Sequence, residues 1–87
     1  MATTVVNLRY EKYDVYIGRG SKWGNKYIIG KDGNREEVVD KYEEDIRQNK
    51  YLLSLLYELK NKRLGCFCKP LSCHGDVLVK LIGEFCV

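Results

Sequence analysis

Three short runs along the chain predict strands, and the first two are rich in β-branched and aromatic residues. The first two cover residues 3–8 (TTVVNL) and 14–18 (DVYIG). The third covers residues 63–68 (RLGCFC) and is mostly apolar, which is typical of a buried strand. Pro70 follows it, and because proline cannot donate to a sheet ladder, the strand is expected to stop there.

Between and after these strands, apolar residues recur at helical spacing. Asn34 followed by Glu37 has the form of a capping box and predicts a helix start. A second apolar helix is expected over residues 51–60 (YLLSLLYELK) and a last one over residues 76–85 (DVLVKLIGEF). The apolar stripe of the first helix consists of Val38, Val39, Tyr42 and Ile46, and that of the last consists of Val77, Leu78, Leu81, Ile82 and Phe85.

The element order is therefore roughly ββααβα. A strand, two helices and another strand favour a parallel crossover, because parallel strands need a long connection. We expect a single α/β domain over residues 1–87, built as a small two-layer or three-layer sandwich with a short, mostly parallel sheet. A chain of 87 residues buries only about 60–65% of its unfolded surface, so help from a ligand or a second subunit is plausible.

Charge changes this picture only locally. The net charge is +3, and two basic segments flank an acidic one at residues 36–45. That distribution favours a localised anion site over an extended nucleic-acid surface. No run of about 20 apolar residues and no signal-peptide pattern is visible, so no membrane partner and a cytoplasmic location are expected. In that compartment cysteines are usually thiols or metal ligands.

Candidate chemistry lies in two loops, each of which follows a predicted strand. In a parallel sheet, ligands bind beyond the carboxyl ends of the strands, so the loops GRGSKWGN and KPLSCHGD are expected to share one pocket. The candidate ligand-binding residues are Arg19, Gly20, Ser21, Lys22, Trp23, Asn25, Cys73, His74, Gly75 and Asp76.

Each group of candidates has a chemical reason. Arg19, Ser21, Lys22 and Asn25 are partners for phosphate and hydroxyl groups. The start of the last helix, with Gly75 allowing close approach, offers backbone donors to an anion. Trp23 in a polar loop can stack on a base, or it can cover the small core.

Two further interpretations concern the cysteines. Cys66, Cys68, Cys73 and His74 have ligand types for a structural zinc, although their spacing differs from the usual pairs. Cys73 at a helix start, beside His74 and near Asp76, has the parts of a nucleophilic site. As an alternative to both, Cys66 and Cys68 are buried thiols that pack as small hydrophobes.

The combination VYIGRGSKWGN, IGKDGNREEVVDKYEE and LGCFCKPLSCHGDVL resembles the domain of unknown function 4326 family, which is frequent in bacteriophages. Members of that family often have proline at the position of Lys26 and tryptophan at that of Phe67. The C-x-C strand followed by P-x-x-C-H at a helix start is also similar to another uncharacterised α/β family, and both families resemble distant members of the nucleotide-binding SLOG-type superfamily.

The resemblance implies a pocket for a nucleotide or an ADP-ribose derivative. A small phage protein of this kind is expected to bind and hide a host immune signal, with no cofactor and no reaction. The alternatives are a hydrolase that cleaves such a ligand at an N-glycosidic or phosphoester bond, with Cys73, His74 and Asp76 as its catalytic candidates, or a zinc-stabilised interaction module. Because the helix over residues 51–60 is apolar around much of its circumference, a homo-oligomer is also expected.

Overall fold

The computed structural model describes residues 3–67, 71 and 73–85. It is a three-stranded α/β domain, so the fold class and the approximate element order expected from the sequence are confirmed. The elements, in chain order, are β1 (Thr4–Asn7), β2 (Val15–Tyr16), α1 (Arg35–Arg47), α2 (Lys50–Ser54), the 3₁₀ turn η1 (Leu56–Leu59), β3 (Arg63–Cys66) and α3 (His74–Phe85).

The sheet has the order β1-β3-β2, and both outer strands run parallel to β3. Val5 and Val15 both pair with Leu64, which places these three side chains on the same face of the sheet. Leu64 is fully buried there because that face carries the helices. Gly65 belongs to the other face, where a β-carbon would collide with the ring of Tyr13. The connection between β1 and β2 therefore lies against the second face.

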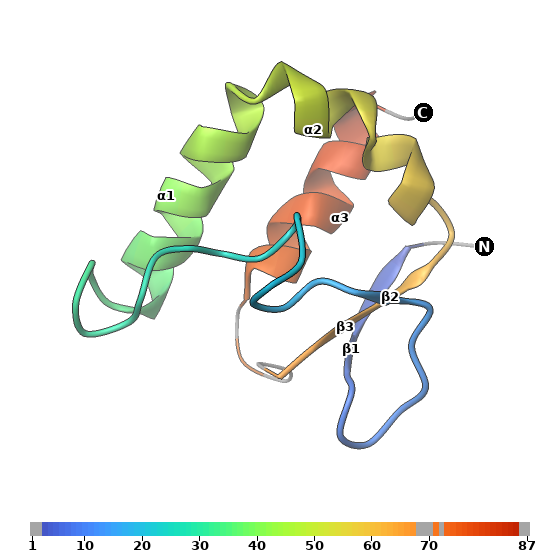
Figure 1. The fold of residues 1–87 in the computed structure, drawn as a ribbon, viewed down its shortest axis with the longest axis horizontal. Coiled ribbons are helices and arrows are strands. Elements are labelled where there is room, and N and C mark those ends of the chain that lie inside the picture. Colours follow the sequence, from blue (N-terminus) through green and yellow to red (C-terminus); the bar gives the residue numbers. More distant parts are fainter. Residues whose placement is uncertain (1–2, 68–70, 72, 86–87) are drawn as a thin grey trace.

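Helix α3 is the centre of the packing, because it contacts α1, η1 and β1 (Figure 1). Leu78 and Leu81 on α3 are fully buried, as are Leu56 and Leu59 on η1. At the start of α3, a β-carbon on Gly75 would meet Ile17 and Val5, so the absence of a side chain lets the helix approach the sheet closely. The core thus joins one face of the sheet to α3 and, through α3, to the other helices.

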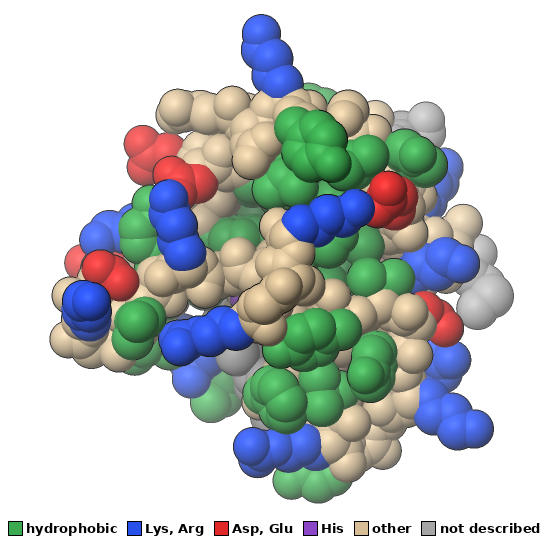
Figure 2. All heavy atoms as spheres, viewed as in Figure 1, with side chains coloured by type: hydrophobic (Ala, Val, Ile, Leu, Met, Phe, Trp, Pro, Cys, Tyr) green, Lys and Arg blue, Asp and Glu red, His purple; other side chains and the backbone are tan. Residues whose placement is uncertain are grey.

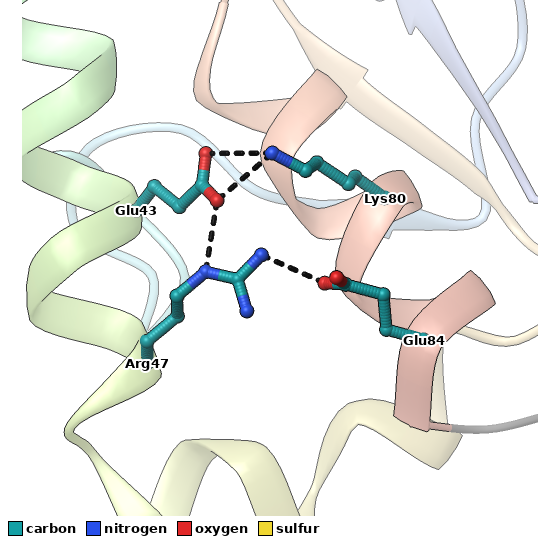
Figure 3. Close-up of polar contacts among 4 residues, drawn as sticks. All are labelled: Glu43, Arg47, Lys80 and Glu84. Carbon is teal, nitrogen blue, oxygen red and sulfur yellow. Dashed lines mark hydrogen bonds and ion pairs between the residues drawn. The ribbon is translucent and has the colours of Figure 1, made fainter.

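Helix α1 begins as expected. The side chain of Asn34 accepts a hydrogen bond from the backbone of Glu37, and the Glu37 carboxylate accepts one from the backbone of Asn34. Farther along, Glu43 and Arg47 form a chain of ion pairs with Lys80 and Glu84 on α3 (Figure 3). The two cations lower the pKa of the Glu43 carboxyl, with the Lys80 hydrogen bond contributing most.

The expectation of one continuous helix over residues 51–60 is wrong. That segment is divided into α2 and η1, with Leu55 between them. The division turns Leu56 and Leu59 into the core, while Tyr51 and Tyr57 remain about two-thirds exposed. Most of the apolar surface that suggested a subunit contact is consequently covered within the chain.

Figure 2 shows one face of the molecule, in the same view as Figure 1. On this face the Lys and Arg side chains are scattered and do not gather into one patch. Within the described part of the chain, no helix combines the length and the apolar character required to cross a membrane.

Candidate functional site

A pocket of about 450 Å³ opens at the carboxyl ends of β2 and β3. It lies between the loop after β2, the start of α1 and the start of α3. Residues from both loops that the sequence singled out line it, so the structure brings those loops together. Its described lining consists of Tyr16, Gly18, Arg19, Asn25, Tyr27, Ile28, Ile29, Arg35, Val38, Val39, Cys66, Phe67, Cys73 and His74.

The loop after β2 is held by hydrogen bonds to its own backbone carbonyls. Ser21 donates hydrogen bonds from both its backbone N–H and its hydroxyl to the carbonyl of Gly18, at 3.1 and 2.7 Å. Gly20 has a φ of +91°, which an L-residue with a side chain rarely adopts. The Tyr16 hydroxyl closes the turn by donating to the carbonyl of Arg19 at 2.9 Å. Gly20 and Ser21 therefore shape the turn but do not line the pocket.

The two cations of this loop have different surroundings. The ammonium of Lys22 lies 2.8 Å from the Glu58 carboxylate, which raises the pKa of Lys22, and its side chain does not line the pocket. Arg19 does line the pocket and is exposed. Its guanidinium makes no ion pair with any residue that the structure describes. Of the two, only Arg19 is placed to meet a bound anion.

Trp23 is a core residue. Its side chain is only 2% exposed, and its carbonyl accepts a buried hydrogen bond of 2.7 Å from the Tyr42 hydroxyl on α1. The expected stacking of this ring on a base is not compatible with such burial, because neither ring face reaches the pocket. The alternative interpretation, a lid over the small core, describes its position. Trp23 therefore anchors the loop to the core and, through its carbonyl, to α1.

Asn25 and Tyr27 attach the loop to α1. The Asn25 amide donates to the carbonyl of Val38 at 3.0 Å, and its side-chain oxygen accepts from the backbone of Tyr27 at 2.9 Å. The Tyr27 hydroxyl donates to Asp45 at 2.7 Å, which raises the pKa of Tyr27. The ammonium of Lys41 lies 5.7 Å from the centre of the Tyr27 ring. Asn25 therefore has a structural role in addition to lining the pocket.

Sequence reasoning missed the wall formed by α1 and the segment before it. Arg35, Val38 and Val39 come from the first two turns of that helix. Ile28 and Ile29 line the pocket as well, although they are 37% and 50% exposed. A usable signal was present, since the apolar run YII interrupts an otherwise polar, glycine-rich loop. An exposed apolar run of this kind indicates a surface that something covers.

The second loop delivers Cys73 and His74 at the start of α3. The Asp76 carboxylate accepts a hydrogen bond from the backbone N–H of Cys73 at 3.2 Å and so caps the helix. Asp76 and Gly75 do not line the pocket. The thiol sulfur of Cys73 lies 3.2 Å from that of Cys66 at the end of β3, and both residues are buried.

His74 connects three elements from a buried position. Burial lowers the pKa of His74, so the neutral ring is favoured at pH 7. Its Nε2 lies 2.6 Å from the carbonyl of Ile17, and since a carbonyl can only accept, the neutral ring carries its proton on Nε2. The ring also meets Tyr42 edge-to-face, with centroids 5.0 Å apart. His74 thereby links the end of β2 to α3 and α1.

These contacts bear on the two alternative interpretations of the cysteine loop. In the described contacts, the Nε2 of His74 is engaged with the Ile17 carbonyl, and the Asp76 carboxylate accepts from the backbone of Cys73. Neither of these two contacts pairs a base with an orienting group behind the Cys73 thiol. Among the described residues there is no group of three or more His, Cys, Asp or Glu placed to hold a metal ion. The proposed zinc ligand Cys68 lies outside the described residues.

The sequence from residue 4 to residue 84 matches the family described as Domain of unknown function (DUF4326). The chain belongs to this family. The expected family membership is thus confirmed, and it covers every described strand and nearly all of the described helices.

Relatives with curated sequences are viral. The chain is 39% identical over 85 residues to an uncharacterized 12.4 kDa protein in the nrdA-td intergenic region of Enterobacteria phage T4, a match that covers 92% of this chain and 77% of the phage protein. It is 37% identical over 91 residues to an uncharacterized protein of Acanthamoeba polyphaga mimivirus, covering 78% of this chain and 65% of that protein. No solved structure matches the chain significantly.

Proposed function

We propose that this protein binds a small anionic ligand with a flat ring, of the nucleotide or ADP-ribose type, in the pocket beyond β2 and β3. The observation that carries this proposal is the position of Arg19, a guanidinium that lines a largely apolar pocket and has no ion-pair partner among the described residues. Such a cation at a concave site is a ready partner for a phosphate, to which guanidinium can donate two hydrogen bonds.

The rest of the lining supports a ligand that has a flat, apolar part. A cavity of about 450 Å³ is within the usual range for small-molecule sites. Its walls combine the rings of Tyr16, Tyr27 and Phe67 with the aliphatic side chains of α1 and the loop before it. Aromatic rings in such a wall can stack on a base, a role that Tyr27 takes over from the buried Trp23 in this proposal.

Binding without reaction is the form of the proposal that fits the pocket best. The Nε2 of His74 is engaged with the Ile17 carbonyl, and Asp76 does not line the pocket. The nucleotide class follows the resemblance to SLOG-type domains, and the viral relatives suggest a host molecule as the ligand. In this proposal the protein sequesters a nucleotide-type immune signal in the cytoplasm of the host.

Isothermal titration calorimetry with AMP, ADP-ribose, cyclic ADP-ribose and NAD⁺ tests the proposal. We expect at least one of these to bind to the wild type and to bind at least about tenfold more weakly to Arg19→Ala, because a charge-assisted contact is lost. The bound compound should be recovered chemically unchanged after heat denaturation. Absence of binding by the whole series would contradict the proposal, and recovery of a cleaved product would favour the hydrolase.

A homo-oligomer remains a prediction. The exposed rings of Tyr51 and Tyr57 are what α2 and η1 offer to a second subunit. Light scattering at micromolar concentration should report more than one 10.1 kDa chain per particle, and a monomer would contradict the prediction.

A further inference from the structure

Two buried thiols meet in the wall of the pocket. Cys66 ends β3 and Cys73 directly precedes α3, yet their sulfur atoms lie only 3.2 Å apart. Both are present as thiols, both line the pocket, and their exposed fractions are 1% and 2%. The fold thus holds together two sulfurs that come from different elements.

Only a small movement separates this arrangement from a covalent bond. A disulfide has a sulfur–sulfur distance of about 2.05 Å, so the two atoms would have to approach by about 1 Å. Side-chain rotation can supply a movement of this size. A disulfide between these positions would close a ring over residues 66–73 and tie the end of β3 to the start of α3.

The two thiols are chemically unequal. The backbone N–H of Gly75 donates to the Cys73 sulfur at 3.2 Å. Cys73 also lies at the amino end of the 12-residue helix α3, whose dipole favours negative charge at that position. The two residues are equally buried, and both influences favour negative charge on the Cys73 sulfur over the Cys66 sulfur, so Cys73 is the thiol better placed to attack a disulfide. Cys66 is then the thiol that completes the exchange.

We propose that Cys66 and Cys73 are a redox-active dithiol that closes to a disulfide by exchange with a small-molecule disulfide such as oxidised glutathione. The Cys73 thiolate attacks one glutathione sulfur, which forms a mixed disulfide and releases one glutathione thiolate. Cys66, after losing its proton, attacks the Cys73 sulfur and releases the second. The protons from the two cysteines end on the two departing thiolates, so one external disulfide is reduced while the protein dithiol is oxidised.

This proposal does not depend on the ligand proposed above, although the two thiols line the same pocket. Disulfides in the cytosol are usually transient and serve catalysis or sensing, which is what a reversible pair in a pocket wall would do. Because both sulfurs line the pocket, oxidation changes the chemistry that the pocket presents to any occupant. Reduced protein is accordingly expected from a reducing compartment.

Equilibration in mixtures of reduced and oxidised glutathione, with EDTA present, tests the proposal. The protein is quenched with acid, its remaining thiols are alkylated, and peptides are mapped by mass spectrometry. We expect a Cys66–Cys73 disulfide at equilibrium. The effective concentration of one thiol with respect to the other should be at least about tenfold higher in native buffer than in denaturant, because the fold already holds the sulfurs together.

Matched variants identify the pair. The double variant Cys68→Ser, Cys86→Ser should form the same disulfide to the same extent as the wild type. Cys66→Ser should instead accumulate glutathione on Cys73, since the completing thiol is absent. The proposal is overturned if Cys66 and Cys73 remain fully alkylatable in the most oxidising mixture, if the disulfide joins another pair, or if native buffer gives no advantage over denaturant.

Discussion

The loops that follow β2 and β3 meet at one pocket, but they use their polar groups differently. In the first loop, Ser21 bonds to Gly18 and Lys22 pairs with Glu58, while Arg19 faces the pocket with no such pairing among the described residues. In the second, Cys73 and His74 line the pocket while also bonding within the core. Apart from Asn25, which does both, the first loop thus separates structural from ligand-facing residues, whereas the second uses the same residues for both.

The largest expected effect concerns the anchor of the first loop. Trp23→Ala should lower the free energy of unfolding by about 3–5 kcal/mol, since it removes a large buried side chain. Trp23→Phe should cost less because it keeps part of the volume. Urea denaturation followed by circular dichroism measures both. An alanine variant as stable as the wild type would place the ring outside the core and restore its role as a stacking partner.

A substitution of Arg19 should weaken ligand binding and leave stability unchanged. Arg19→Ala is expected to reduce ligand affinity by about 1.5–3 kcal/mol, roughly ten- to a hundredfold, with the midpoint of unfolding unchanged. Lys22→Ala is the matched control, because it removes a cation of the same loop that is paired with Glu58. It should change affinity by no more than about threefold in ordinary salt. Equal losses for both variants would mean that the pocket responds to overall charge.

The second loop is tested by pH. Burial lowers the pKa of His74 in the folded state, so below about pH 6.5 the unfolded chain takes up a proton that the folded chain does not. The stabilising effect of the neutral ring is therefore complete at higher pH and is lost as the pH falls from about 7 towards 5, with a slope of at most about 1.4 kcal/mol per pH unit.

His74 is the only histidine, so this pH window is otherwise sparsely titrated. His74→Gln keeps a side-chain donor for the Ile17 carbonyl and removes the titration. Its stability should be nearly constant between pH 5 and 7, as measured by urea denaturation at each pH. A slope that persists in His74→Gln would show that another group titrates.

The smallest effect is expected for the surface ion pair between Glu43 and Lys80 (Figure 3). This pair joins α1 to α3, as the buried contact between Tyr42 and His74 also does. Glu43→Gln should lower stability by less than about 1 kcal/mol, because ion pairs at the surface are weak in water. The difference should vanish at about 1 M salt, where such charges are screened. A loss as large as that of Trp23→Ala would contradict this ranking.

Local signals in the sequence were sufficient for much of the fold. The Asn34 and Glu37 capping box lies where it was expected, because such a cap depends on residues close in the chain. The parallel sheet followed from the length of the crossover between strands. The break between α2 and η1 did not follow, since it depends on turning Leu56 and Leu59 towards α3, a contact between distant residues.

For the candidate site, the sequence indicated which loops would meet but not which side chains would face the cavity. Arg19, Asn25, Cys73 and His74 line it, while Trp23 does not. Glycine-rich sequence predicts a loop without giving its side-chain directions, so a core anchor and a stacking ring look alike. The wall formed by α1 was missed because its apolar residues were assigned to the core. Tertiary packing decides both the side-chain directions in the loop and which apolar residues of α1 face the cavity.

The strand order has a consequence for the way the chain is made. β3 is the middle strand, and β1 and β2 pair only with it among the described strands. Both outer strands leave the ribosome before their partner does, so they have no sheet to join until residue 66 has been synthesised. Helix α3, which packs on that sheet, emerges later still. Sheet and core can therefore form only after β3 and α3 have been synthesised, and a nascent chain stalled before β3 should remain sensitive to protease.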